Sequence, residues 1–261
     1  AVATVLSQVF SFAICAAGLK RLEFVSLLDG SKSKNARLAV RMLKTGLPVG
    51  IMSMVTAVGG MILQFFVNDL GASAVAAYAA STKIRSVIGE FSNALGMTFM
   101  TFVGQNYGAG QLKRCRKTLF LCLIEDAVAT AAAIGIVLLS CRFLLSIFNN
   151  DPAVIDLGYV RLVTIFFAYI FSMLYEVMSG YLRGFGISLT PAILTTLGVC
   201  GVRIVWIAAV FPKSRTFETI MTAYPVSLSL TAVLIFIALL IAHPSRRYAS
   251  KFVTQKATDN N

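Results

Sequence analysis

The sequence predicts an all-α, polytopic membrane protein with seven transmembrane helices. Seven apolar runs are each long enough to cross a bilayer, since a spanning helix needs about 20 residues. These runs cover residues 1–19, 44–69, 73–102, 116–148, 153–183, 190–211 and 219–242. Only 13% of the residues are charged and 57% are hydrophobic, whereas about a quarter of a soluble domain is charged. One water-soluble core cannot hold this apolar excess, so we expect lipid around the helices.

The distribution of positive charge predicts how the chain crosses the membrane. The formal net charge is +12, and the basic residues gather in the gap at 20–43, in the gap around Lys113 and in the tail after residue 242. The gaps after Asn68 and Asn149 carry few basic residues. By the positive-inside rule, the basic segments and the C-terminus are cytoplasmic and the N-terminal end lies outside the cell membrane. Lipid headgroups suffice as partners for such loops, so we expect no nucleic-acid partner.

The hydrophilic stretch at 20–43 predicts the domain organisation. It resembles a cytoplasmic connector between two helix bundles. We therefore interpret 1–19 as the last helix of a preceding bundle, 44–242 as a six-helix lobe and 243–261 as a basic cytoplasmic tail with a disordered end. The chain opens directly into an apolar run without Met, which suggests the C-terminal piece of a longer protein.

Proline and glycine mark several expected helix ends and contacts. Asp151 before Pro152, and Thr190 before Pro191, each predict an N-cap followed by a proline in the first turn. Pairs of glycines four residues apart predict close helix packing, because a small side chain lets two backbones approach. These pairs are Gly46 with Gly50, Gly104 with Gly108, and Gly180 with Gly184.

Polar residues recur at helical spacing on four of the apolar runs. A charged group inside a bilayer costs an estimated 2.5–3.5 kcal/mol on insertion scales, so such residues normally face a bundle interior or a wet cavity. Four polar faces that converge predict a substrate and ion pathway. We expect this pathway to be lined by Glu176, Gln64, Glu90, Asn93, Arg203, Lys83, Ser172, Tyr169 and Ser179.

Glu176 is the leading candidate to bind a proton or a cation, because it lies within a long apolar run. The alternative is structural: a permanent ion pair of Glu176 with Arg203, or of Lys83 with Glu90, would hold helices together.

Other charged residues are expected at the membrane boundary. Glu125 and Asp126 are adjacent, so on a helix they point about 100° apart and cannot form a paired site. We expect both to contact basic loop residues, and we expect Arg85, Arg142 and Arg161 to be interfacial.

The sequence lacks the motifs of common enzymes and cofactor sites. It contains no GxSxG, HExxH or GxxxxGK pattern. The five cysteines show no metal-ligand or redox spacing, and the single histidine, His243, follows the last run. We therefore expect neither an enzyme nor a bound metal or organic cofactor.

Several motifs give the chain a resemblance to a known family. Residues 101–110 (TFVGQNYGAG) resemble the cytoplasmic signature after the eighth helix of the MATE (multidrug and toxic compound extrusion) transporters. Residues 181–186 (YLRGFG) resemble the turn between the tenth and eleventh helices of that family, and 46–50 (GLPVG) resemble the start of its seventh helix. Residues 202–206 (VRIVW) and 224–227 (YPVS) are similar to the bacterial MepA/DinF-like branch.

The resemblance implies twelve helices in two lobes that rock around a central cavity and expel small organic cations in exchange for H⁺ or Na⁺. This chain would supply the sixth helix and the C-terminal lobe, and its partner would be the N-terminal lobe of the same protein. One departure concerns the coupling ion. NorM-like members carry an acidic ligand in the seventh helix where this chain has Thr56, so coupling would depend mainly on the other lobe.

Two alternative functions stay open at this point. A flippase for lipid-linked saccharides, from a related superfamily, would need a strongly basic cavity, and the interior charges of the apolar runs are not net basic. An intramembrane enzyme would need a catalytic constellation, and no candidate dyad emerges from the sequence. A structural membrane subunit would lack polar faces that converge on a water-filled cleft.

Overall fold

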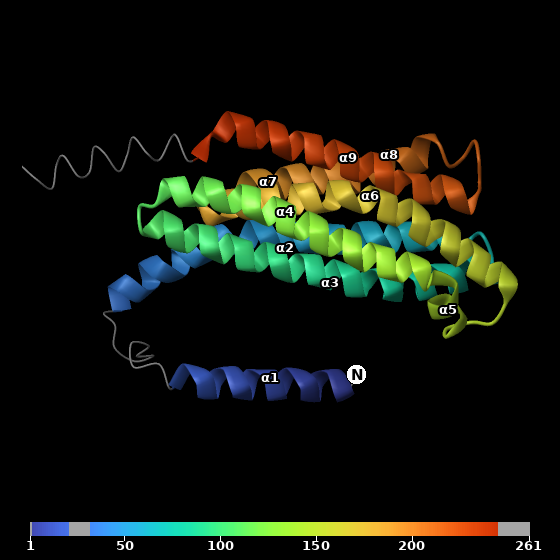
Figure 1. The fold of residues 1–261 in the computed structure, drawn as a ribbon, viewed down its shortest axis with the longest axis horizontal. Helices are drawn as coiled ribbons and strands as arrows, with labels where there is room; N and C mark the ends of the chain where they lie inside the picture. The colour runs from blue at the N-terminus through green and yellow to red at the C-terminus, as the bar shows by residue number, and fades with distance from the viewer. Residues whose placement is uncertain (1, 21–31, 245–261) are drawn as a thin grey trace, which may run out of the picture. The chain divides into compact units, whose positions relative to one another are not determined.

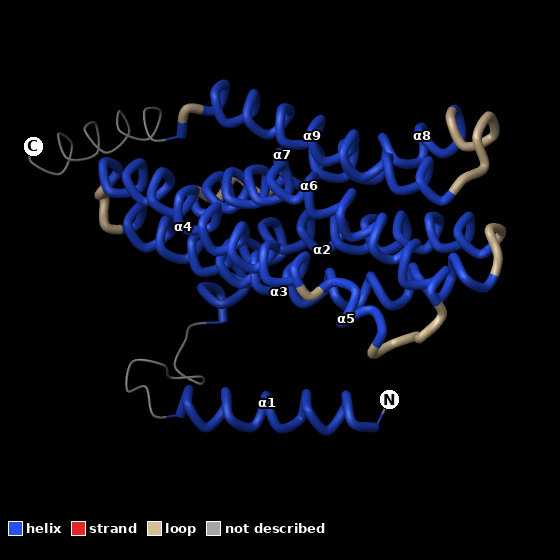
Figure 2. The backbone as a smooth tube through the Cα atoms, turned by 45° about the vertical axis from the view of Figure 1, so that its right-hand side comes forward, coloured by secondary structure: helices blue, strands red, loops and turns tan. Residues whose placement is uncertain are grey.

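The computed structural model describes residues 2–20 and 32–244, and in these ranges every regular element is helical (Figure 2). The elements are α1 (Val2–Lys20), α2 (Lys32–Asn68), α3 (Ala72–Gly108), α4 (Leu112–Leu139), α5 (Cys141–Ser146), α6 (Pro152–Gly184), α7 (Leu189–Thr195), a π-helical segment η1 (Thr196–Gly201), α8 (Val202–Ala209) and α9 (Phe217–Ala242). All seven predicted runs therefore form helices, and the predicted fold class is confirmed.

Five helical stretches are long and apolar enough to cross a membrane. They are Met42–Asn68, Leu112–Leu139, Pro152–Gly184, Leu189–Ala209 and Phe217–Ala242. The apolar part of α1, Val5–Gly18, is shorter, and α3 carries Lys83, Arg85 and Glu90 near its middle. The outer faces of the helices are apolar: Leu139 is 92% exposed and Phe167 is 81% exposed. Lipid covers such surfaces, so the chain is a polytopic membrane protein.

The chain divides into two compact units, Ala1–Lys44 and Thr45–Asn261. The first unit contains α1, on which apolar side chains such as Phe10 and Phe12 are exposed. The predicted connector at 20–43 is helical from Lys32 onward, because α2 begins there. The rest of that connector, 21–31, and the predicted tail after Pro244 lie outside the described residues.

In the second unit, α6 is the central helix. It packs most extensively against α3 and α9 and also contacts α4 (Figure 1). Buried side chains form three clusters: one includes Ile165 and Ile220, a second includes Val199 and Leu228, and a third includes Phe99 and other residues of α3, α4 and α6. Every cluster contains residues of α6, so this helix positions the elements around it.

Glycines allow α3 and α6 to approach closely. A Cβ atom built on Gly180 would lie 3.3 Å from the carbonyl oxygen of Gly96, and one on Gly184 would lie 2.7 Å from Cγ1 of Val103. A Cβ on Gly104 would lie 3.6 Å from the carbonyl oxygen of Gly184. The predicted close packing is thus present at the 180–184 pair.

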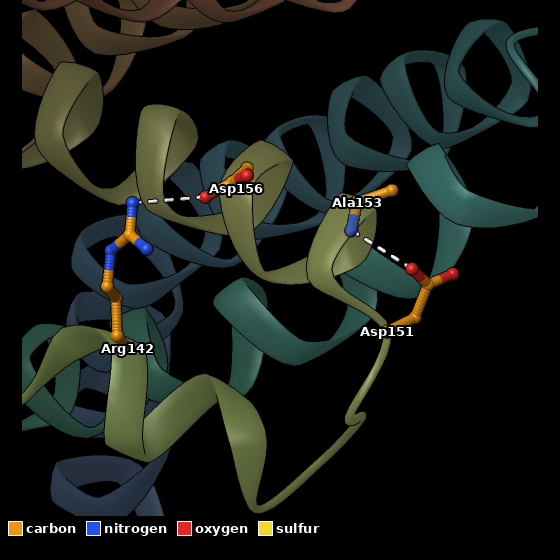
Figure 3. A network of polar contacts seen from close by, with 4 residues as sticks. All are labelled: Arg142, Asp151, Ala153 and Asp156. Atoms are coloured by element: carbon orange, nitrogen blue, oxygen red, sulfur yellow. Dashed lines mark hydrogen bonds and ion pairs between the residues drawn. The ribbon is translucent and has the colours of Figure 1, made fainter.

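The two predicted proline-marked helix starts have different outcomes. Asp151 caps α6 as predicted: its Oδ1 accepts a hydrogen bond from the backbone N–H of Ala153 at 3.0 Å (Figure 3). The predicted cap at Thr190 is wrong, because α7 begins at Leu189 with Ser188 in the N-cap position. Gly186, with a φ of 81°, turns the chain immediately after α6, so the next helix starts earlier than the proline alone suggests.

Gly184→Ala is expected to lower the free energy of unfolding by about 1–3 kcal/mol, because the added methyl group overpacks against Val103 and the carbonyl of Met100. The matched control is Gly135→Ala on α4, where a Cβ atom has open space. Alanine there should be neutral or stabilising by about 0.5–1 kcal/mol, since glycine weakens helices. Thermal unfolding of the purified full-length protein in detergent measures both, and equal effects would contradict the packing argument.

Candidate functional site

A cleft of about 450 Å³ lies within the second unit, between α2, α3, α6, the η1–α8 segment and α9. The polar residues that face it include Gln64, Arg85, Tyr169, Ser172, Arg203 and Tyr224. Tyr169 lies near the middle of α6, so the cleft lies near the middle of this helix's length.

Arg85 reaches the cleft from α3. Its Nη1 donates a hydrogen bond to the hydroxyl of Tyr169 at 3.3 Å, and its buried Nε has no partner among the described residues. Gly89, one turn further along α3, makes room for this contact, since a Cβ atom there would lie 3.2 Å from the Tyr169 hydroxyl. The arginine is therefore held at one nitrogen and leaves other donors unused.

Arg203 reaches the cleft from α8. Its Nε donates to Oγ of Ser227 at 2.9 Å, and its guanidinium carbon lies 4.2 Å from the centroid of the Tyr224 ring. The residues just before it form the π-helical segment η1, and such segments occur frequently at functional sites. Gly198 in η1 lies directly against Thr231, so α8 and α9 approach closely enough for these contacts.

A third arginine, Arg161, lies behind the cleft and is 1% exposed. Its Nη1 donates to the Tyr78 carbonyl and to the hydroxyls of Ser81 at 2.6 Å and Thr82 at 2.8 Å. Its guanidinium carbon lies 3.7 Å from the centroid of the Tyr78 ring. The Tyr78 and Tyr224 hydroxyls are 3.4 Å apart. Because Arg161 stacks on Tyr78 and Arg203 stacks on Tyr224, the two tyrosines connect the two arginines.

The expectation that Arg85 and Arg161 are interfacial is wrong. Arg85 is half-buried and lines the cleft, and Arg161 is buried. On α6, Arg161, Ile165 and Tyr169 form one buried face. These positions are four residues apart, so they continue the polar face predicted for α6 by two more turns toward its N-terminus. The same periodicity could have identified Arg161 from the sequence.

None of these three arginines forms an ion pair within the described ranges. The one ion pair found there joins Arg142 to Asp156 at 3.1 Å, with both side chains exposed near the start of α6 (Figure 3). The predicted pairs of Glu176 with Arg203 and of Lys83 with Glu90 are therefore wrong. The positive charge that acts on Glu176 electrostatically is Arg183, two turns further along α6, and the two do not form an ion pair.

The predicted pathway residues occupy different places. Gln64, Tyr169, Ser172 and Arg203 line the cleft. Glu176 lies one turn beyond Ser172 and is half-buried.

The other predicted residues lie away from the cleft lining. Ser179 is fully buried, and its Oγ has no partner in the part of the chain described. Lys83, Glu90 and Asn93 are exposed on α3. The roles of all nine residues stay predictions.

Asp126 is a second candidate that the sequence did not reveal. It was expected to contact basic loops, but it is 3% exposed and accepts a hydrogen bond from Thr130 Oγ1 at 3.1 Å. Its carboxylate is close enough to that of Glu176 to interact electrostatically. Glu125, the adjacent residue, is exposed. The rotation of about 100° per residue separates the two side chains, and packing of α4 against α3 and α6 buries only one.

An all-helical membrane bundle with a polar cleft between its helices has the architecture of a membrane transporter. The MatE family model matches residues 48–208, which is more than half of the chain. The chain therefore belongs to the MatE family.

Similar proteins support this assignment. The chain is 21% identical over 242 residues to the probable multidrug resistance protein YoeA of Bacillus subtilis, which covers 90% of this chain and 52% of the relative. It is 29% identical over 109 residues to the FAD transporter of Shewanella oneidensis, covering 42% of this chain and 24% of that protein. A crystal structure of MATE in complex with MaD5 matches with a TM-score of 0.75 at 15% identity, over 97% of this chain and 55% of the other. The chain thus spans about half the length of YoeA.

Ser227→Ala is expected to lower the free energy of unfolding by about 1–3 kcal/mol, because it removes the buried acceptor of the Arg203 Nε–H. Ser229→Ala is the matched control. Both serines donate to the carbonyl three residues earlier on α9, but only Ser227 also accepts from an arginine among the described residues. Thermal unfolding of the full-length protein in detergent checks the difference, and equal losses for the two variants would show that the Arg203 contact contributes little.

Proposed function

We propose that this chain forms one lobe of an ion-coupled antiporter that exports small organic molecules by alternating access. The proposal depends on one observation: a chain of the MatE family has a cleft lined by polar side chains from several helices. Polar and charged side chains are costly next to lipid, but a transport pathway that contacts water can accommodate them inside a membrane.

The second wall of the transport cavity belongs, in this proposal, to an N-terminal lobe of the same protein. Rocking of the two lobes would open the cleft alternately to the two sides of the membrane. The basic gaps predict that the C-terminus is cytoplasmic and that α1 begins on the outer side of the cell membrane.

Coupling to H⁺ or Na⁺ is assigned in this proposal to buried carboxylates, with Glu176 and Asp126 as the candidates in this lobe. Asp126 on α4 and Glu176 on α6 interact electrostatically, so a bound proton or cation would offset the cost of holding two negative charges near each other. Thr56 borders the cleft, at the position where the resemblance to NorM-like members implies an acidic ligand. In this proposal, coupling therefore also needs an acidic site in the other lobe.

The organic cations implied by the family resemblance would need acidic groups outside this cleft, since no acidic residue described here lines it. The basic lining favours a second candidate function, the flippase for lipid-linked saccharides. Transport of an anionic headgroup would use the same arginines.

Glu176→Gln and Asp126→Asn are each expected to reduce gradient-driven dye efflux by about tenfold or more, equivalent to at least ~1.4 kcal/mol, because neither amide can bind a coupling proton. The measurement uses proteoliposomes of the full-length transporter with an imposed proton or sodium gradient. Glu218→Gln is the control, since Glu218 is exposed in the first turn of α9. If Glu176→Gln retains both the rate and its pH dependence, Glu176 has no part in coupling.

A further inference from the structure

We propose that the cleft lined by Arg85 and Arg203 binds a small organic anion that carries a flat aromatic group. This inference rests on the proposed function, because the site is the same cleft, and it specifies the charge and shape of the substrate.

The charge of the cleft carries the first part of the argument. Two guanidinium groups from different helices line it, and Arg161 lies directly behind it against Tyr78 and Thr82. Within residues 2–20 and 32–244, no carboxylate lies within ion-pairing distance of any of the three. A cation inside a bilayer normally has a counter-charge, because the unpaired group costs an estimated 2.5–3.5 kcal/mol. An anionic ligand would supply it.

The unused hydrogen-bond donors indicate where an anion would bind. Arg203 uses its Nε for Ser227, and the structure gives its two terminal nitrogens no hydrogen bond within the described residues. Arg85 donates only from Nη1, to a tyrosine hydroxyl, and its buried Nε is unpartnered there. A guanidinium with two free N–H groups can bind a carboxylate or a phosphate group in a bidentate manner. The two arginines thus offer a planar acidic group a preformed site.

The aromatic lining specifies the rest of the ligand. Tyr78, Tyr169, Tyr175 and Tyr224 all border the cleft and are each less than a tenth exposed. Arg161 and Arg203 cover faces of the Tyr78 and Tyr224 rings. The contact surface left for an aromatic group therefore comes from Tyr169 and Tyr175, together with apolar side chains such as Leu228. The volume of about 450 Å³ falls within the range of roughly 300–1,000 Å³ found for pockets of drug-sized ligands. A tricyclic aromatic acid satisfies both the charge and the shape.

Two dyes of matched shape and opposite charge test the proposal. Fluorescein is an anionic xanthene and rhodamine 123 is a cationic one. Their binding to the full-length protein in phosphatidylcholine nanodiscs is measured by fluorescence anisotropy without any ion gradient. We expect fluorescein to bind at least tenfold more tightly than rhodamine 123.

Substitutions locate the binding to the cleft. Arg85→Gln and Arg203→Gln should each weaken fluorescein binding by tenfold or more and leave rhodamine 123 binding unchanged. Arg142→Gln is the matched control, because Arg142 is exposed and pairs with Asp156 at the start of α6; it should bind fluorescein as the unchanged protein does. Arg203→Lys keeps the charge, so it should retain more affinity than Arg203→Gln even if the latter is less stable.

Three results would overturn the proposal. The first is tighter binding of rhodamine 123, which would mean that a carboxylate of the other lobe neutralises these arginines. The second is unchanged fluorescein binding in both glutamine variants and in Arg203→Lys. The third is complete displacement of fluorescein by inorganic phosphate or by phosphatidylglycerol in the nanodisc at equal concentration, which would assign the site to phosphate or to a lipid headgroup.

The dye-binding test of the anion site and the efflux test of the antiport can give independent results. Charge-selective binding without gradient-driven efflux would contradict the antiport and support the anion site. Gradient-driven efflux with no preference for fluorescein would support the antiport and contradict the anion site.

Discussion

A lipid environment requires buried polar groups to find partners within the protein, and Arg161 is the place where this constraint acts most strongly. Its guanidinium joins α6 to α3 through the Tyr78 carbonyl and the hydroxyls of Ser81 and Thr82, and it stacks on the Tyr78 ring. Tyr78 in turn lies beside Tyr224 of α9. The most buried charge of the described bundle therefore connects its three most extensively packed helices.

The same three helices contribute side chains to the cleft. Glycines 180 and 184 bring α6 against α3 near one end, and Tyr169 lines the cleft near the middle of α6. The cleft and the tight helix contact thus lie at different positions along α6.

Periodicity identified some residues that border the cleft, and their roles stay predictions. Tyr169 and Ser172 were identified because they recur on one face of a helix, and both line the cleft. The same argument placed Glu90 on an equivalent face of α3, but its side chain is exposed away from the cleft lining. Helical spacing identifies a face, and only the packing of neighbouring helices determines what that face contacts. Asp126 was missed for the converse reason, since its partner Thr130 matters only once α4 packs against α3 and α6.

The sequence alone determined that this protein is helical and membrane-embedded, since run length and hydropathy depend only on the local chain and its solvent. It also determined the helix start at Asp151, where cap and proline are adjacent. Only the tertiary structure decided the charge of the cleft. Arg85, Arg161 and Arg203 lie on three different helices, and no local pattern predicts which charges meet when those helices pack or which carboxylates stay apart from them.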